Sequence, residues 1–203
     1  MWHNNQQRDI ILESLTLTNH HGFLAVLLTG SGKSLLFLIP AMMSDSTVVV
    51  VFFPLNALVQ TMAQQSRDYG IHCTVWNEQK TRNPVTKTLL LVSMDYMATS
   101  TTLWKFMRKL EPENCLGRFV IDEVHTLMSS EFREHRLQQV RKIRVINQPL
   151  IFTTATLPPS LQHSITEILC FQDTQLHVHQ QTSARPNICV ILFQPLSTKE
   201  SEE

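Results

Sequence analysis

The sequence predicts an α/β domain built around a parallel sheet. Apolar, β-branched segments recur along the 203-residue chain, and longer segments of helical periodicity separate them. Most of these segments are apolar at every position, which is typical of strands that helices cover on both faces. We expect strands at 23–28, 47–53, 72–76, 88–93, 118–122, 149–153 and 187–193. We expect helices at 6–17, 33–43, 56–67, 94–109, 131–144 and 158–169.

Local signals support these elements in chain order. The strand segments read FLAVLL, TVVVVFF, HCTVW, TLLLVS, RFVID, PLIFT and NICVILF. Pro54 closes the second of them, because proline cannot donate a ladder hydrogen bond. Pro158 and Pro159 suit the first turn of the helix that they open. The final residues, PLSTKESEE, are polar and acidic, so we expect a frayed tail there.

Composition indicates a globular protein without an overall charge bias. Hydrophobic residues make up 43% and charged residues 17%, and Lys+Arg and Asp+Glu both total 17. Net charge therefore gives no indication of nucleic-acid binding. Segment 137–145 (LQQVRKIRV) is the one compact basic patch, through Arg141, Lys142 and Arg144. It fits either an exposed helix face or a nucleic-acid contact.

The cysteines and histidines do not form a metal-binding pattern. The four cysteines, at 73, 115, 170 and 189, are widely spaced and include no CxxC pair, which favours a reducing compartment. His177 and His179 share one face of an expected strand without a nearby third ligand, so we interpret them as ordinary exposed histidines. The chain shows neither a signal-peptide pattern nor an apolar run of membrane-spanning length. We expect a soluble, intracellular protein.

A glycine-rich turn after the first core strand predicts a phosphate-binding loop. The segment TGSGKS, residues 29–34, places Gly30 and Gly32 before Lys33 and Ser34. Backbone N–H groups of such a turn can surround phosphates, the lysine can neutralise the β and γ oxygens, and the serine hydroxyl can bind Mg²⁺. Leu27 occupies the first glycine position of the full pattern. The alternative is a flexible glycine turn that happens to precede a lysine.

Two adjacent carboxylates end the strand at 118–122. In FVIDEVH, Asp122 is placed to hold Mg²⁺ opposite Ser34, and Glu123 is then free to act as general base on the water that attacks the γ-phosphate. His125 can couple this site to neighbouring segments by hydrogen bonding. Without the upstream loop, the same pair would indicate only a solvated strand end.

The segment FTTATLPPS provides a third strand end with polar side chains. Thr154 and Thr156 flank Ala155, and their hydroxyls can reach the acidic pair or its water. The alternative is a threonine-rich strand terminus ahead of a helix that starts with proline.

TGSGKS, DEVH and TATLPPS, in this order, resemble the first motor lobe of superfamily 2 helicases. The sequence is more specifically similar to the RecQ family, and its DEVHT and TATLPPS variants look closest to divergent fungal RecQ-like helicases. Further segments that resemble RecQ motifs are QQRDII, GKSLLFLIPA with Phe37 at or near the aromatic position, VVVVFFPLNALVQTM and SARPNI.

The resemblance implies a RecA-like P-loop NTPase domain, with a parallel sheet flanked by helices on both faces. It implies ATP and Mg²⁺ as cofactors, DNA as partner, 3′–5′ unwinding and a nuclear location. Gln7 would read the adenine edge, and the segment 29–34, Thr29 and Ser31 included, would bind the phosphates. In VVVVFFPLNALVQTM, a strand ends in Pro-Leu, and the helix that follows would contact the DNA strand.

Several features depart from the family pattern. WHNNQ replaces the Arg-containing run before the glutamine, and the loop after the carboxylates is shortened, retaining Phe132 and Arg133 but no tryptophan. We expect residues 1–182 to form the ATP-binding lobe and 183–203 to begin the connection to a second lobe, which would carry the arginine finger. The chain then corresponds to one helicase lobe, a fragment or a degenerate copy, with nucleotide binding but little ATPase activity of its own.

Two other functions stay open. One is a stand-alone module that binds ATP and DNA without useful turnover. The other is a P-loop enzyme such as a small-molecule kinase, although DEVH and TAT at successive strand ends have no role in a typical kinase.

Overall fold

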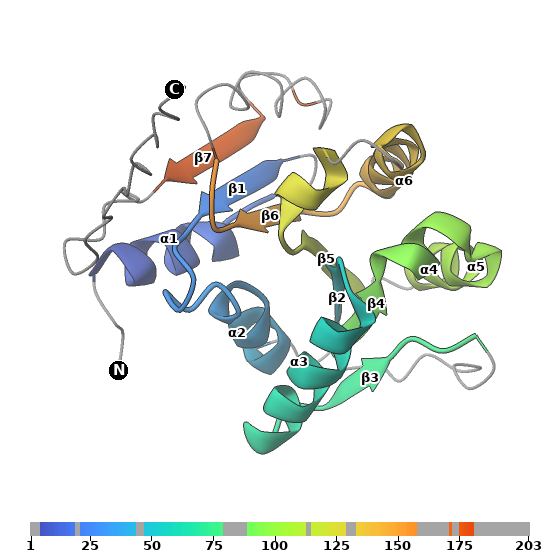
Figure 1. Ribbon diagram of the computed structural model, residues 1–203, viewed down its shortest axis with the longest axis horizontal. Helices are drawn as coiled ribbons and strands as arrows, with labels where there is room; N and C mark the ends of the chain where they lie inside the picture. The colour runs from blue at the N-terminus through green and yellow to red at the C-terminus, as the bar shows by residue number, and fades with distance from the viewer. Residues whose placement is uncertain are drawn as a thin grey trace, which may run out of the picture.

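The computed structural model describes residues 5–18, 21–43, 47–78, 89–112, 115–128, 133–157, 171 and 175–180. Within these residues, the chain alternates between strands and helices (Figure 1). The helices are α1 (Asn5–Leu15), α2 (Leu35–Met43), α3 (Asn56–Asp68), α4 (Met94–Thr99), α5 (Thr101–Leu110), the 3₁₀ helix η1 (Val124–Met128) and α6 (Arg133–Val145). The strands are β1 (Gly22–Val26), β2 (Val48–Phe53), β3 (Cys73–Val75), β4 (Leu89–Ser93), β5 (Leu116–Ile121), β6 (Leu150–Thr154) and β7 (Leu176–Gln180).

The strands of the described region form one sheet in the order β3-β4-β2-β5-β6-β1-β7. Every strand pair in it is parallel, so the predicted parallel α/β sheet is confirmed. The order brings β5, β6 and β1 side by side, although they are far apart in sequence. Because parallel strands end at the same edge of a sheet, the loops that follow these three strands meet there.

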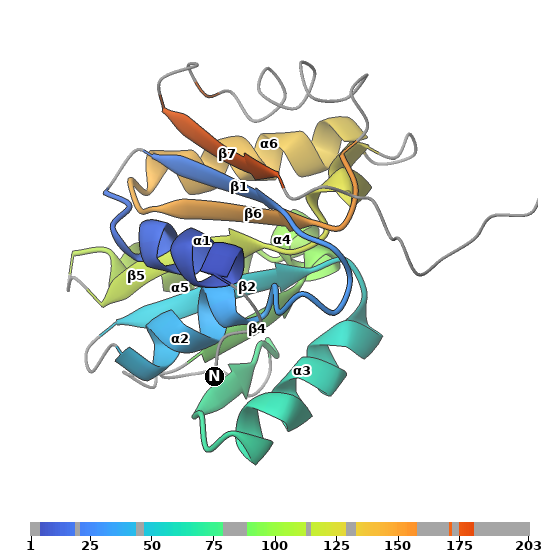
Figure 2. The same ribbon diagram turned by 90° about the vertical axis from the view of Figure 1, so that its left-hand side faces the viewer.

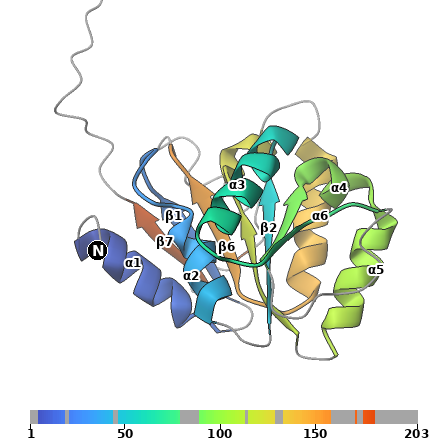
Figure 3. The same cartoon turned by 90° about the horizontal axis from the view of Figure 1, so that it is seen from below.

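Helices cover both faces of the sheet, as predicted. Helices α1, α2 and α3 lie on one face, and α4, α5 and α6 lie on the other (Figures 2 and 3). Each face has its own buried apolar cluster: one includes Ile10, Leu36 and Val59, and the other includes Met97 and Val140. Burial on both faces explains why β1, β2 and β4 are apolar along their whole length.

The structure differs from the predicted helices and strands at three places. The helix expected at 94–109 is two helices, because the buried Ser100 ends α4 and its hydroxyl accepts the backbone N–H of Leu103 as the N-cap of α5. Helix α2 begins at Leu35, not Lys33. The strand that carries His177 and His179 is β7, which the strand ranges above omitted and which pairs with β1 at the sheet edge.

His177 and His179 also contact α1. His177 Nδ1 lies 3.4 Å from Glu13 Oε1, and His179 Nε2 lies 2.6 Å from Glu13 Oε2. These contacts join α1 to the edge strand.

The helix expected at 158–169, the strand expected at 187–193 and the segment 183–203 lie outside the described residues. Among the helices that are described, none is long and apolar enough to cross a membrane.

Candidate functional site

The glycine-rich loop after β1 depends on two residues in left-handed backbone conformation. Gly30 has φ of 82° and Gly32 has φ of 83°, a region that glycine enters at little cost. Backbone bonds from Leu36 to Lys33 and from Phe37 to Ser34 then lead into α2. The loop and the N-terminal end of α2 thus lie together at the carboxyl edge of the sheet, as a phosphate loop requires.

Gln7 of α1 contacts this loop directly. It is buried, at 2% exposure, and its Nε2 donates to the backbone carbonyl of Ser31 over 2.7 Å. A Cβ atom on Gly32 would lie 2.2 Å from the same Nε2, so a side chain there would displace the Gln7 amide in addition to the strain from its φ. The sequence suggested that Gln7 meets the nucleotide base; the structure adds a direct contact with the loop.

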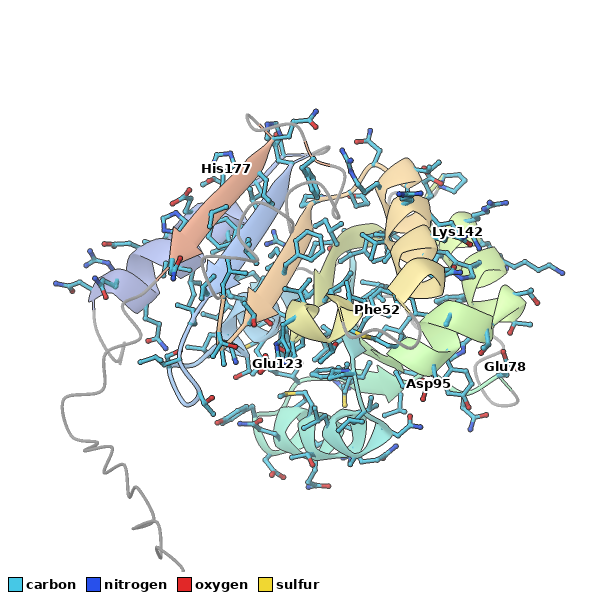
Figure 4. All side chains as sticks on the ribbon, turned by 45° about the horizontal axis from the view of Figure 1, so that its top comes forward. Phe52, Glu78, Asp95, Glu123, Lys142 and His177 are labelled. Atoms are coloured by element: carbon cyan, nitrogen blue, oxygen red, sulfur yellow. The ribbon has the colours of Figure 1, made fainter. Side chains whose placement is uncertain are left out.

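Lys33 connects the loop to the carboxyl end of β5. Its Nζ lies 2.8 Å from Glu123 Oε1, and both side chains are largely shielded from solvent. Glu123 has φ of 51°, an uncommon value for a residue with a side chain, at the turn between β5 and η1 (Figure 4). Such strain costs about 1–3 kcal/mol and is concentrated at functional sites.

Asp122 is a half-buried carboxyl with a close hydroxyl partner. Thr153 of β6 donates to Asp122 Oδ1, a contact that follows from the register in which Ile121 of β5 pairs with Phe152 of β6. Burial raises the pKa of Asp122 above its ordinary value, and the Glu123 charge adds to this effect; the Thr153 hydrogen bond, the Lys33 charge and a backbone hydrogen bond from Glu123 oppose it. The neighbouring groups therefore do not fully offset the effect of burial on the Asp122 carboxylate, and a bound cation could offset the rest.

A second network extends from Glu123 to the end of β6. His125 Nδ1 lies 3.3 Å from Glu123 Oε2 and 3.0 Å from Thr154 Oγ1, and the Ala155 N–H donates to Glu123 Oε2 over 3.3 Å. Thr154 Oγ1 donates in turn to the carbonyl of Thr156. The structure thus brings His125 and the TAT segment to Glu123, whereas the hydroxyl at Asp122 comes from Thr153, which sequence reasoning missed.

A pocket of about 510 Å³ lies beside this network. Several predicted residues line it: Gln7, Gly30, Gly32, Lys33, Ser34 and Asp122. Thr29 and Ser31 do not line it; Thr29 is exposed, and the Ser31 hydroxyl donates to the Leu28 carbonyl. Sequence reasoning missed the wall formed by Met62 and Gln65 of α3 and by Tyr69, which follows the helix. Their spacing of three and four residues was the available signal, since it puts them on one helix face.

Comparison with protein families matches residues 4–164 to the DEAD/DEAH box helicases. The chain belongs to this family. It is 29% identical over 193 residues to the RecQ-like DNA helicase blm-1 of Caenorhabditis elegans, an alignment that covers 86% of this chain. It is also 29% identical to the RecQ-like DNA helicase BLM of Xenopus laevis over 73% of this chain. The RecQ-like resemblance inferred from the motifs is therefore confirmed.

A solved structure supports the fold. The DUF1998 helicase MrfA, crystallised bound to DNA, matches 87% of this chain with a TM-score of 0.67 at 18% identity. This likeness confirms the RecA-like fold. The relatives are much longer proteins: the alignments span 19% of the C. elegans helicase, 12% of the Xenopus helicase and 27% of the MrfA chain.

Proposed function

We propose that this helicase domain is the Mg²⁺-ATP-binding lobe of a protein that hydrolyses ATP to unwind DNA in the 3′–5′ direction, and that the lobe alone has little ATPase activity. The observation that carries the proposal is the continuous set of contacts from Lys33 through Glu123 to His125 and Thr154. It connects a phosphate-loop lysine, a candidate base and a third strand end in one network.

The residues present fit a magnesium nucleotide. Ser34 and Asp122 line the pocket and offer hard oxygen ligands, which Mg²⁺ prefers. A divalent cation near Asp122 would favour its ionised form, which burial disfavours. Magnesium supplies charge neutralisation on the phosphate oxygens. The backbone N–H groups of the glycine-rich loop and the Lys33 ammonium would hold those oxygens.

Lys33 would have two positions, one paired with Glu123 and one in contact with the nucleotide phosphates. Lys33 Nζ can leave Glu123 Oε1 for the phosphates, which releases a carboxylate oxygen to accept a proton from the attacking water. Glu123 Oε2 meanwhile keeps its contacts with His125 and the Ala155 N–H. These contacts fix the carboxylate, and they give Thr154 a path by which the state of the nucleotide reaches β6.

DNA binding, the domain limits and the location are also proposals. Leu55 and Leu58, at the start of α3, are exposed, as expected for the helix that contacts DNA in RecQ-like proteins. We assign residues 1–182 to the ATP-binding lobe and 183–203, outside the described part of the chain, to the start of the connection to a second lobe. Nuclear location follows from the resemblance to RecQ-like helicases.

Titration with a fluorescent ATP analogue tests the binding step. The 203-residue chain should bind it in the presence of Mg²⁺, and Lys33→Ala should weaken binding by about ten- to a hundredfold, the effect of losing a charged hydrogen bond. Lys109→Ala, on an exposed lysine in α5, is the control and should leave the affinity unchanged. Equal affinity for Lys33→Ala and the unsubstituted chain would show that the loop does not bind the nucleotide.

Hydrolysis separates the helicase function from that of a binding module. Steady-state ATPase rates should be measured with and without single-stranded DNA for the 203-residue chain, for the protein that contains it together with a second lobe, and for Glu123→Gln in that protein. A rate near background for the 203-residue chain, together with a DNA-stimulated rate in the two-lobe protein that Glu123→Gln abolishes while nucleotide binding is retained, supports the proposal. Mg²⁺-ATP binding through Lys33 together with a rate that Glu123→Gln does not change would favour the alternative, a module without useful turnover.

A further inference from the structure

A second pocket, of about 520 Å³, lies between α5 and α6. It is lined along α5 as far as Glu111 and along the last turn of α6 as far as Ile146. The chain enters β5 and β6 soon after these two residues, whereas the candidate nucleotide site follows the opposite ends of the same strands. Lys142 at this pocket and Glu123 at the nucleotide site accordingly lie well apart (Figure 4). The pocket is thus a separate site.

The pocket carries an excess of positive charge. Lys105 and Arg108 line it from α5 and Lys142 lines it from α6, against the single carboxylate of Glu111. Within the described residues, none of the three cations forms an ion pair. This excess is local, because the whole chain has no net charge. The basic segment seen in the sequence thus contributes one side chain, Lys142, to a concave site.

Helix dipoles explain only part of this arrangement. Cations in the last turn of a helix are favoured by the partial negative charge there, which accounts for Arg108 and Lys142. Lys105 lies in the middle of α5, where this effect is small. The dipole also gives no reason for a pocket, or for Val145 at its edge, which is 81% exposed.

The apolar part of the pocket is already organised. The Trp104 ring is held by a hydrogen bond from its Nε1 to the Met97 carbonyl over 3.1 Å, and Lys142 Nζ lies 5.7 Å from the ring centroid. Single-stranded nucleic acids bind by stacking bases on free aromatic faces. Here Lys142 lies over one face of the tryptophan, so the site offers positive charge beside apolar walls and not an open stacking platform.

We propose that this pocket binds an acidic peptide segment of a partner protein. One large apolar side chain of the peptide would pack against Val145 and Trp104, and flanking carboxylates would pair with Lys105, Arg108 and Lys142. Charge complementarity specifies the partner, and the pocket volume suits one such side chain with its neighbours. A partner held here would leave the nucleotide site open.

Fluorescence anisotropy with the peptide EDEWEDE, labelled at its N-terminus, tests the proposal. The 203-residue chain should bind this peptide, and replacing its tryptophan by serine should weaken binding. The double variant Lys105→Glu, Arg108→Glu should weaken it by tenfold or more, since about 1.4 kcal/mol corresponds to each factor of ten. Val145→Ser should weaken it less. Far-UV circular dichroism melting checks that each variant is folded.

Two matched substitutions and one competitor decide the interpretation. Lys109→Glu and Arg141→Glu change exposed cations on the same helices outside the pocket, and they should leave peptide affinity nearly unchanged. An unlabelled oligothymidylate of equal charge should not displace the labelled peptide. Failure of the peptide to bind, equal losses in the control variants, or displacement of the peptide by the oligothymidylate would each overturn the proposal.

Discussion

Gly30 and Gly32 have nearly the same backbone conformation but different surroundings. Their φ values are 82° and 83°, so a side chain at either position meets the same backbone strain. A Cβ atom on Gly30 would meet nothing within 4 Å, whereas one on Gly32 would meet Gln7. The first glycine is therefore favoured by the turn alone, whereas a side chain at the second would also displace the Gln7 amide from the loop.

We predict that Gly30→Ala lowers the free energy of unfolding by about 1–2 kcal/mol, the cost of a left-handed alanine. Gly32→Ala should cost more, because the alanine methyl also displaces the Gln7 amide. Removing that amide with Gln7→Ala in the Gly32→Ala background should recover part of the extra loss. Urea denaturation of the single and double variants measures this coupling. Equal losses for the two glycines would mean that the Gln7 contact contributes nothing.

The sequence identified the site residues whose position depends only on where a strand ends. Lys33, Asp122 and Ala155 each follow an apolar strand, so their meeting at one sheet edge follows from a parallel sheet with these strands adjacent. Thr153 and Tyr69 could not be found in this way. The contact of Thr153 depends on the register between two strands, and that of Tyr69 on how α3 packs beside the loop. Both depend on tertiary packing.

At the scale of elements, helical periodicity did not reveal the break between α4 and α5. Segment 94–109 keeps apolar residues at helical spacing throughout, and Met97 and Leu103 are both fully buried. The break comes from Ser100, whose side chain is an alternative partner for the backbone. Its Oγ accepts from the Leu103 N–H over 3.1 Å and also contacts Thr102 Oγ1 over 2.9 Å. A serine between two threonines was the only local signal.

We predict that Ser100→Ala lowers the free energy of unfolding by about 1 kcal/mol, the usual cost of removing a helix N-cap. Ser100 is 2% exposed, so water cannot replace its hydroxyl at the Leu103 N–H. Thr101→Ala, at the adjacent exposed position, is the matched control and should be close to neutral. Urea denaturation of both variants provides the measurement. A neutral Ser100→Ala would indicate that the two helices do not depend on this cap.

For the whole molecule, the interior strand β2 joins the two apolar clusters. Phe52 and Phe53 are adjacent and almost fully buried, and they belong to opposite clusters. Phe52 stacks on Phe119 of β5, whereas Phe53 meets Phe37 of α2 edge-to-face. The sequence could predict a sheet buried on both faces, but it could not give the strand order that puts β2 next to β5. Because the faces share one sheet, we expect them to unfold together.

We predict that Phe52→Ala and Phe53→Ala each lower the free energy of unfolding by about 3–5 kcal/mol. Each variant should still unfold in one transition, with near-UV and far-UV circular dichroism changing at the same temperature. The two substitutions should differ in their effect on nucleotide affinity, because Phe37 lines the nucleotide pocket and packs on Phe53. Phe53→Ala should therefore weaken Mg²⁺-ATP binding, and Phe52→Ala should leave it nearly unchanged at temperatures where both variants are folded. A two-step melt in either variant would instead mean that the sheet does not couple its two faces.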